Sequence, residues 1–321
     1  MKKNEIATVD YNDYISNDES KRLTFIADFG DSFSNMGFAI VKNHGVSDAL
    51  KKKLMTVSET FFKLSTDQKQ KYEDLALAGQ RGYISKLRES AKGKSVPDIK
   101  EFYHIGQTVI DGDEIKNEYP NNIWPKEVIE FEKVCQEVYQ KFEQTGQNLL
   151  KATALYLELS EDYFSPKIHN GNSILRLLHY YPVKDINDIP KGAVRAAAHG
   201  DINLITLLMG GSAEGLQAQT LDGDWISVNP NDDEIVVNIG DMLARLTNNR
   251  FRSTQHRVIT PNESSWLTPR FSTPFFLHPR SDMDLTCLET CISNQNPKTY
   301  SDMSAGEFLT ERLIELGLKI K

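Results

Sequence analysis

The chain has 321 residues, of which 39% are hydrophobic and 26% charged, and a formal net charge of −8 at pH 7. This composition is typical of a folded globular protein with a large core, and the negative charge argues against a nucleic-acid partner. No apolar run is long enough to span a membrane, and no apolar segment follows the first lysines as it would in a secretory signal. Three irregularly spaced cysteines argue against a disulfide framework and favour a reducing cytoplasm.

The first half of the chain predicts three helices and one strand. Apolar residues at three- to four-residue steps predict helices over 21–36, from Ser47 onward and over 126–158. The run GFAIVKNHG, residues 37–45, has the pattern of a strand that closes at turn residues. The first helix is expected to bury Leu23, Ile26, Phe29 and Phe33.

Residues 76–98 differ in character, being rich in Gly, Ser, Lys and Arg. This composition predicts a long excursion over the surface. Long ordered loops of this kind often serve as lids over functional sites, and we expect the segment GQRGY, residues 79–83, to belong to such a lid.

From Gly171 onward the apolar period changes to two, the period of strands. Turn residues separate short strand-like runs, which we expect over 173–182, 203–209, 216–220, 225–230, 234–241, 253–259 and 270–279. Short strands with regular turns predict an antiparallel sandwich or barrel. A last helix is expected to begin at the capping box Ser304–Glu307 and to end at Gly317.

The triplet His199-Gly200-Asp201 is a candidate for two metal ligands. If a strand begins at His199, the imidazole and the carboxylate project from the same side of it. His256, in a later strand-like run, is the candidate for a third ligand. Two histidines and one carboxylate on one side of a metal suit non-haem Fe(II) with open positions. The alternative is that His256 is a core or surface histidine of a strand, and that the triplet arose by chance.

Arg270 and Ser272 likewise share one face of a predicted strand. A guanidinium beside a hydroxyl suits a carboxylate ligand, because both donate hydrogen bonds to its oxygens. The alternative is a surface salt bridge, since Arg88-Glu89-Ser90 shows the same spacing elsewhere. No acidic residue near Arg270 in the sequence offers itself as a partner.

These motifs, in this order, resemble the 2-oxoglutarate- and Fe(II)-dependent oxygenases of the isopenicillin N synthase-like family. The resemblance rests on GFAIVKNHGV, HGDINLITLL, VNIGDMLARLTNNRFRSTQHRV and RFS, which together extend over nearly the whole chain. It implies a mainly β fold with flanking helices and a double-stranded β-helix (jelly-roll) core. It further implies an N-terminal α/β region over 1–110, a helical connection over 111–170 and the catalytic core over 171–321, integrated in one unit.

The resemblance also implies the roles of individual residues. His199, Asp201 and His256 are expected to bind Fe(II), and Arg270 and Ser272 to hold the distal carboxylate of 2-oxoglutarate. Many members carry Asn-x-Tyr before the core, where this chain has His179 and Tyr181, so we expect these two residues near the cosubstrate. The segment 261–269 is interpreted as a lengthened hairpin loop before Arg270.

The activity implied is the decarboxylation of 2-oxoglutarate to succinate and CO2 with O2, coupled to oxidation of a small organic substrate, most often hydroxylation. Alternatives are an oxidase of the same fold that uses no 2-oxoglutarate, and a non-catalytic metal-binding jelly roll. We expect a cytoplasmic monomer. Candidate substrate contacts are Arg81, Tyr83, Phe102, His104, Arg176 and Phe276. If the two arginines face the pocket, the substrate is expected to be anionic.

Overall fold

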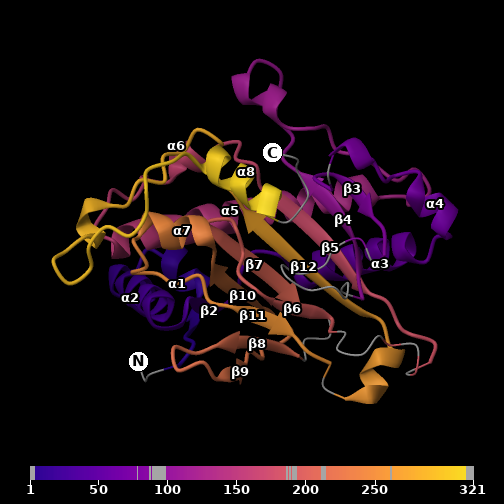
Figure 1. The fold of residues 1–321 in the computed structure, drawn as a ribbon, viewed down its shortest axis with the longest axis horizontal. Coiled ribbons are helices and arrows are strands. Elements are labelled where there is room, and N and C mark those ends of the chain that lie inside the picture. Colours follow the sequence, from indigo (N-terminus) through magenta and orange to yellow (C-terminus); the bar gives the residue numbers. More distant parts are fainter. Residues whose placement is uncertain are drawn as a thin grey trace.

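The structure is a computed structural model that describes residues 4–77, 79–86, 88, 99–185, 187, 189, 194–210, 215–260 and 262–315. Figure 1 shows strands crossing the middle of the molecule with helices around them. The strands are β1 (Thr8–Asp10), β2 (Phe38–Lys42), β3 (Gly82–Ile84), β4 (Glu101–Gly106), β5 (Ile174–Tyr180), β6 (Ala196–His199), β7 (Ile205–Gly210), β8 (Leu216–Gln219), β9 (Trp225–Ser227), β10 (Glu234–Ile239), β11 (His256–Val258) and β12 (Arg270–Leu277). The α-helices are α1 (Tyr11–Ile15), α2 (Glu19–Met36), α3 (Asp48–Phe62), α4 (Thr66–Gln70), α5 (Phe131–Tyr156), α6 (Ser165–Ile168), α7 (Asp241–Leu246) and α8 (Ala305–Glu315).

Two sheets face each other. The larger has the strand order β1-β2-β10-β7-β12-β5-β4-β3, and the smaller has the order β6-β11-β8-β9. One apolar cluster joins them, with Phe38 and Val236 from the larger sheet and Leu216, Ala218 and Val258 from the smaller. We call the side of the larger sheet that carries Phe38 its inner face. This arrangement confirms the predicted jelly-roll core with flanking helices.

The larger sheet contains strands from both the predicted N-terminal region and the predicted catalytic core. Strands β1 to β4 come from the first 110 residues, and the other four strands come from residues 174–277. Strand β2 pairs with β10, and β4 pairs with β5. The N-terminal segment is therefore part of the sheet that supports the core, since its strands continue that sheet at both edges.

Helices α2, α3 and α5 cover the outer face of the larger sheet, where they share the main apolar core with it. Helix α2 ends at Gly37, which has a left-handed φ of 69°; a Cβ there would lie 2.2 Å from the backbone oxygen of Arg252. Only glycine fits this turn into β2. The prediction for Leu23 was wrong: it is 58% exposed, and Phe25 is buried instead. No helix among the described residues is long and apolar enough to cross a membrane.

Two loop predictions need correction. The segment 76–98 is not surface loop throughout, because Gly82–Ile84 forms the buried strand β3 against β4. Residues 78, 87 and 89–98 of it lie outside the described part of the chain. The hairpin predicted around 261–269 was wrong, because β11 belongs to the smaller sheet and β12 to the larger. Of that segment the structure describes residues 262–269, which contain a 3-10 helix over Glu263–Leu267.

Each of the seven predicted strand runs overlaps a strand, and the capping box of α8 and the helices predicted over 21–36 and from Ser47 were confirmed. The helix predicted over 126–158 is shorter, since α5 begins at Phe131 and ends at Tyr156. The predicted helix end at Gly317 lies beyond the described residues. Strands β1 and β4 were not predicted, nor was β6, a short run of three alanines and a histidine. Alanine is a weak strand former, so this segment carries no periodic signal of its own.

A buried ion pair supports the outer face of the larger sheet beside β4, the strand next to its β3 edge. Lys69 Nζ lies 2.7 Å from Glu101 Oε2, and their side chains are only 5% and 1% exposed. Tyr83 also donates to this carboxylate, and His179 Nδ1 lies 2.9 Å from Oε1. Burial opposes ionisation of Glu101, but the hydrogen bonds from His179, Lys69 and Tyr83 outweigh it and lower the pKa to about 2.

Replacing this carboxylate is expected to destabilise the fold strongly. In Glu101→Gln the ammonium group of Lys69 stays buried without its counter-ion, and the free energy of unfolding at pH 7 should fall by about 3–5 kcal/mol. Because folding lowers the pKa of Glu101 from 4.5 to about 2, its contribution is complete above pH 4.5 and lost as the pH falls toward 2. Urea denaturation at several pH values measures the difference between variant and wild type, which should shrink across that window.

The matched control is Glu59→Gln, which removes a carboxylate from a solvent-exposed pair with Lys63. Such pairs contribute less than about 1 kcal/mol. Equal losses in the two variants would contradict the role given to the buried pair.

Candidate functional site

The three predicted metal ligands come together where the two sheets meet at one end. His199 is the last residue of β6 and His256 the first of β11, and the two are directly paired across the smaller sheet. Asp201 lies in the turn that leads from β6 to β7, and thus from one sheet to the other. The predicted strand beginning at His199 was therefore wrong, since the strand ends there. The two ligands lie on the same side because the chain turns between them.

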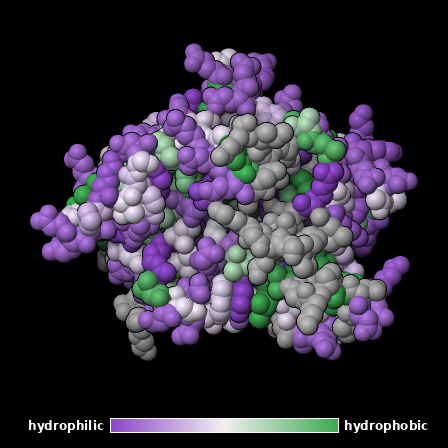
Figure 2. All heavy atoms as spheres, viewed as in Figure 1, coloured by the Kyte–Doolittle hydropathy of each residue, from purple (hydrophilic) through white to green (hydrophobic). Residues whose placement is uncertain are grey.

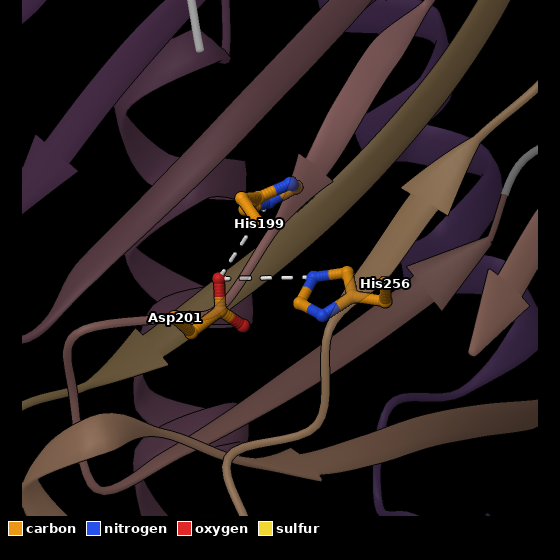
Figure 3. A group of neighbouring side chains, drawn as sticks. All are labelled: His199, Asp201 and His256. Carbon is orange, nitrogen blue, oxygen red and sulfur yellow. Dashed lines mark ion pairs between the residues drawn. The ribbon is translucent and has the colours of Figure 1, made fainter. Parts of the chain in front are cut away.

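The donor atoms of this group all lie within 4.8 Å of one another. The Nε2 atoms of His199 and His256 are each 3.9 Å from Asp201 Oδ1. Figure 3 shows both imidazole rings and the carboxylate turned toward a common centre. The Asp201 and His256 side chains are 6% and 11% exposed, whereas His199 is 44% exposed. The site therefore opens to its surroundings on the His199 side.

Neighbouring groups fix how each ligand presents its donor atom. His199 Nδ1 lies 2.8 Å from the carbonyl of Ala197, and His256 Nδ1 lies 3.2 Å from that of Thr254. Each Nδ1–H donates to its carbonyl, which leaves the Nε2 lone pair for a metal. This pattern of supported imidazoles is typical of metal-ligating histidines.

Asp201 is held by two residues of the larger sheet. Thr206 Oγ1 on β7 donates to Asp201 Oδ2 over 2.6 Å, and Asn238 Nδ2 on β10 donates to the same oxygen over 2.8 Å. Asn203 Nδ2 in turn donates to Thr206 Oγ1 over 3.0 Å. Burial opposes ionisation, but the two imidazoles and these hydrogen bonds outweigh it and lower the pKa of Asp201. Oδ1 remains for a metal, and a set of two nitrogens and one oxygen fits Fe(II) with open positions.

Arg270 and Ser272 lie on the inner face of β12, only 4% and 5% exposed. Their strand also carries Phe276, which pairs with Thr206 beside Asp201. Ser272 and Phe276 are four residue steps apart, or roughly 13 Å of strand. The inner face of β12 therefore leads from the neighbour of Thr206 toward Ser272 and Arg270.

His179 and Tyr181, the two residues predicted to lie near the cosubstrate, have different surroundings. His179 pairs with Phe271 and Glu101, so it lies on the outer face, where its ring stacks on Phe271 at 4.7 Å. The sheet separates it from Arg270, and its predicted contact with the cosubstrate was wrong. Tyr181 follows the end of β5 with its ring 4.1 Å from Lys86 Nζ, and its contact with the cosubstrate stays a prediction.

The inner position beside Arg270 belongs to Tyr180, whose ring centre is 5.1 Å from the guanidinium carbon. Tyr180, Thr206 and Asn238 were not among the predicted site residues. Ser272 pairs with Leu178, and Tyr180, two residues further along β5, lies on the same face. Tyr180 could have been predicted only if the register between β5 and β12 had been known. Nothing in the sequence marks Thr206 or Asn238 apart from nearness to the motifs.

Four of the six candidate substrate residues form one cluster on the inner face of β4, β5 and β12. The Arg176 guanidinium carbon lies 4.1 Å from the centre of the Phe102 ring and 5.1 Å from that of Phe276. Arg176 Nε donates to His104 Nε2 over 2.7 Å, and His104 Nδ1 lies 2.6 Å from the carbonyl of Gly79. The cluster holds one cation between two aromatic rings, one strand away from Ser272.

The other two candidates lie elsewhere. Tyr83 pairs with Tyr103 on the outer face, where it donates to Glu101, so its predicted substrate contact was wrong. Arg81 is 1% exposed, and its guanidinium packs against Gly106, where a Cβ would lie 1.8 Å from it. Desolvation lowers the pKa of Arg81 to about 10. It belongs to the interior and not to a surface lid.

Comparison with known proteins agrees with this geometry. A family model described as the 2OG-Fe(II) oxygenase superfamily matches residues 171–279, and one described as non-haem dioxygenase in morphine synthesis N-terminal matches residues 6–127. The chain belongs to the 2OG-Fe(II) oxygenase superfamily. Among curated relatives of this oxygenase, proline hydroxylase buaE of Petromyces alliaceus is 30% identical over 97% of this chain and 99% of its own length.

Solved structures give the same answer. A protein of Caulobacter crescentus assigned to the 2OG-Fe(II) oxygenase family superposes with a TM-score of 0.87 at 38% identity, covering 97% of this chain and 99% of that one. A full-length protein of Neurospora crassa in complex with alpha-KG superposes with a TM-score of 0.85 at 29% identity, covering 96% and 95% of the chains. The protein is a 2-oxoglutarate- and Fe(II)-dependent dioxygenase with O2 as cosubstrate, and a small-molecule substrate fits this chemistry.

The hydroxyl of Thr206 is expected to tune the metal site through Asp201. Thr206→Val keeps the side-chain shape but removes the donor to Oδ2, so the Fe(II) dissociation constant should rise about 10- to 100-fold. Anaerobic competition with a chromophoric chelator measures this. Thr273→Val, on the outer face of β12, is the control and should leave the affinity unchanged. Equal affinities in both variants would contradict the role of Thr206.

Proposed function

We propose that this oxygenase hydroxylates a small anionic organic substrate, with Fe(II) held by His199, Asp201 and His256. Arg270 and Ser272 would hold the distal carboxylate of 2-oxoglutarate. The observation that carries the proposal is that Arg270 and Ser272 lie on the same inner face of the larger sheet as Thr206, which holds Asp201 and pairs with Phe276 of β12.

The residues of the site have separate tasks in this proposal. Bound Fe(II) would activate O2, and 2-oxoglutarate would be oxidised to succinate and CO2 in the process. Arg270 donates two charge-assisted hydrogen bonds to the distal carboxylate, and Ser272 donates another, which fixes the cosubstrate in one orientation. Tyr180 packs beside Arg270 and keeps water from the guanidinium. Thr206 and Asn238 keep Asp201 ionised and pointing inward.

The substrate would lie against the cluster of Phe102, His104, Arg176 and Phe276. An arginine between two aromatic rings suits an anionic group on a partly apolar molecule, because the rings hold the guanidinium in place and pack against carbon. Hydrogen bonding to His104 fixes the direction of Arg176. Since Phe276 pairs with Thr206, the cluster is close enough to the metal ligands for the substrate to reach them.

We also propose a cytoplasmic monomer. The three cysteines are buried and unpaired, which suits a reducing compartment. Large exposed apolar residues of the described segments are scattered over separate elements, and hydrophilic residues make up most of the coloured surface in Figure 2. Apolar residues dispersed in this way over the described surface favour a monomer.

The proposed cosubstrate site is tested by succinate release. The Fe(II)-loaded protein should convert 2-oxoglutarate to succinate only with O2, and Arg270→Gln should raise the KM for 2-oxoglutarate by at least about tenfold. The matched control is Arg257→Gln on β11, whose guanidinium lies over Trp225. No succinate with a broad substrate panel would favour an oxidase of this fold that needs no 2-oxoglutarate.

The proposed substrate charge is tested with pairs of carboxylates and their amides. In the wild type, the carboxylate of each pair should stimulate succinate release more than the amide does, because Arg176 pairs with the carboxylate. In Arg176→Gln the ratio of the two stimulated rates should fall by at least about tenfold. The ratio of stimulation by the carboxylate to stimulation by the amide is measured within each variant, so a general loss of activity does not change it. Arg22→Gln, at the surface beside Glu161, should keep the ratio. An unchanged ratio in Arg176→Gln contradicts the proposal.

A further inference from the structure

A pocket lies beside helices α7 and α8, outside the region between the two sheets. It has a volume of about 470 Å³ and is walled by α7, α8 and the segments that carry Asn249 to Ser253 and Tyr300. Helices α7 and α8 meet there, since the Arg245 guanidinium carbon lies 5.7 Å from the centre of the Phe308 ring. Figure 1 shows these two helices on the same side of the sheets.

The wall of this pocket is basic. Arg245, Arg252 and Arg312 line it, and Asp241 is the one acidic residue among the described lining residues. Arg312 pairs with Glu315 over 2.8 Å, outside the lining. No described carboxylate lies within ion-pair distance of the guanidinium of Arg245 or Arg252. The pocket therefore carries an excess of positive charge.

Part of the hydrogen-bonding capacity of these arginines is unused. Arg245 Nε, Arg252 Nη1 and Arg312 Nε are buried atoms with no acceptor in reach among the described residues. Leaving such donors buried and unpaired is costly, and buried guanidinium groups normally find anionic partners. Burial lowers the pKa of Arg252. The three unpaired atoms themselves lie beneath the pocket surface, so the indication of an anionic ligand is that no described carboxylate neutralises Arg245 or Arg252 beside the pocket.

Two of the guanidinium groups are held in place before any ligand arrives. Arg245 donates through Nη2 to the carbonyl of Ser301, and its guanidinium carbon lies 5.0 Å from the centre of the Tyr300 ring. The guanidinium carbon of Arg312 lies 5.2 Å from the centre of the Phe308 ring. Fixed guanidinium groups lose little freedom when they bind an oxyanion, which favours recognition of carboxylate or phosphate.

The pocket is a neighbour of the iron site but separate from the cosubstrate site. A Cβ on Gly200, between the ligands His199 and Asp201, would lie 2.9 Å from Ser253 Oγ and 3.3 Å from Asp241 Oδ1, and both residues line the pocket. Arg270 and Ser272, by contrast, lie on the inner face of β12. We propose that the pocket between α7 and α8 binds the carboxylate or phosphate group of a small molecule as a second anion site.

The test is calorimetric titration of the metal-free protein with inorganic phosphate and, separately, with citrate. All titrations use the Arg270→Gln background, so that the cosubstrate site cannot account for binding. We expect saturable binding of at least one probe, weakened about tenfold or more by Arg252→Gln. The stronger of the two probes identifies the ligand as a phosphate or a carboxylate. Because iron and 2-oxoglutarate are absent, the result is independent of the proposed function.

Two further variants keep the test decisive. Arg250→Gln makes the same change two residues away, where the guanidinium lies over Tyr156 outside the pocket, and should leave binding unchanged. Arg252→Lys keeps the charge and should retain more binding than Arg252→Gln, so a folding defect is distinguished from loss of the site. No saturable binding of either probe, or equal weakening by Arg250→Gln and Arg252→Gln, would overturn the proposal.

Discussion

The site depends on the carboxylate of Asp201 being held at the junction of the two sheets. The imidazoles of His199 and His256 are cross-strand neighbours in the smaller sheet, and their separation is fixed by strand pairing. Asp201 reaches them from the turn into β7, while Thr206 and Asn238 hold its other oxygen from the larger sheet. The arrangement of the three ligands therefore depends on how the two sheets face each other. The apolar cluster that joins the sheets supports the metal site by fixing that arrangement.

The same arrangement explains why the residues proposed to bind the cosubstrate and the substrate lie on β4, β5 and β12. These strands continue the larger sheet beyond β7, so their inner-face residues occupy rows that lead away from Asp201. Ser272 and Arg270 lie along β12, and Arg176 lies on the next strand. The outer face of the same strands carries the pair of Lys69 and Glu101. One sheet thus separates a catalytic face from a structural one.

Much of this could be predicted from the sequence, because strand period and motif order are local signals. His199, Asp201 and His256 were predicted to act together, and the structure brings them into one cluster; Arg270 and Ser272 were predicted to share one face of a strand, as they do. The face on which a residue lies was harder to predict, since it depends on register between strands far apart in the chain. His179 and Tyr83 were placed on the wrong face for that reason. Strand β6 was missed because its alanines carry no periodic signal.

The central claim is that one interior space holds both the iron and 2-oxoglutarate, with the cosubstrate running from the triad to Arg270. The most direct test is an anaerobic crystal of the Fe(II)-loaded protein soaked with 2-oxoglutarate. The account predicts metal density among His199, Asp201 and His256, and cosubstrate density extending from it to Arg270 and Ser272. Metal bound elsewhere, or 2-oxoglutarate density that does not reach Arg270, would contradict it.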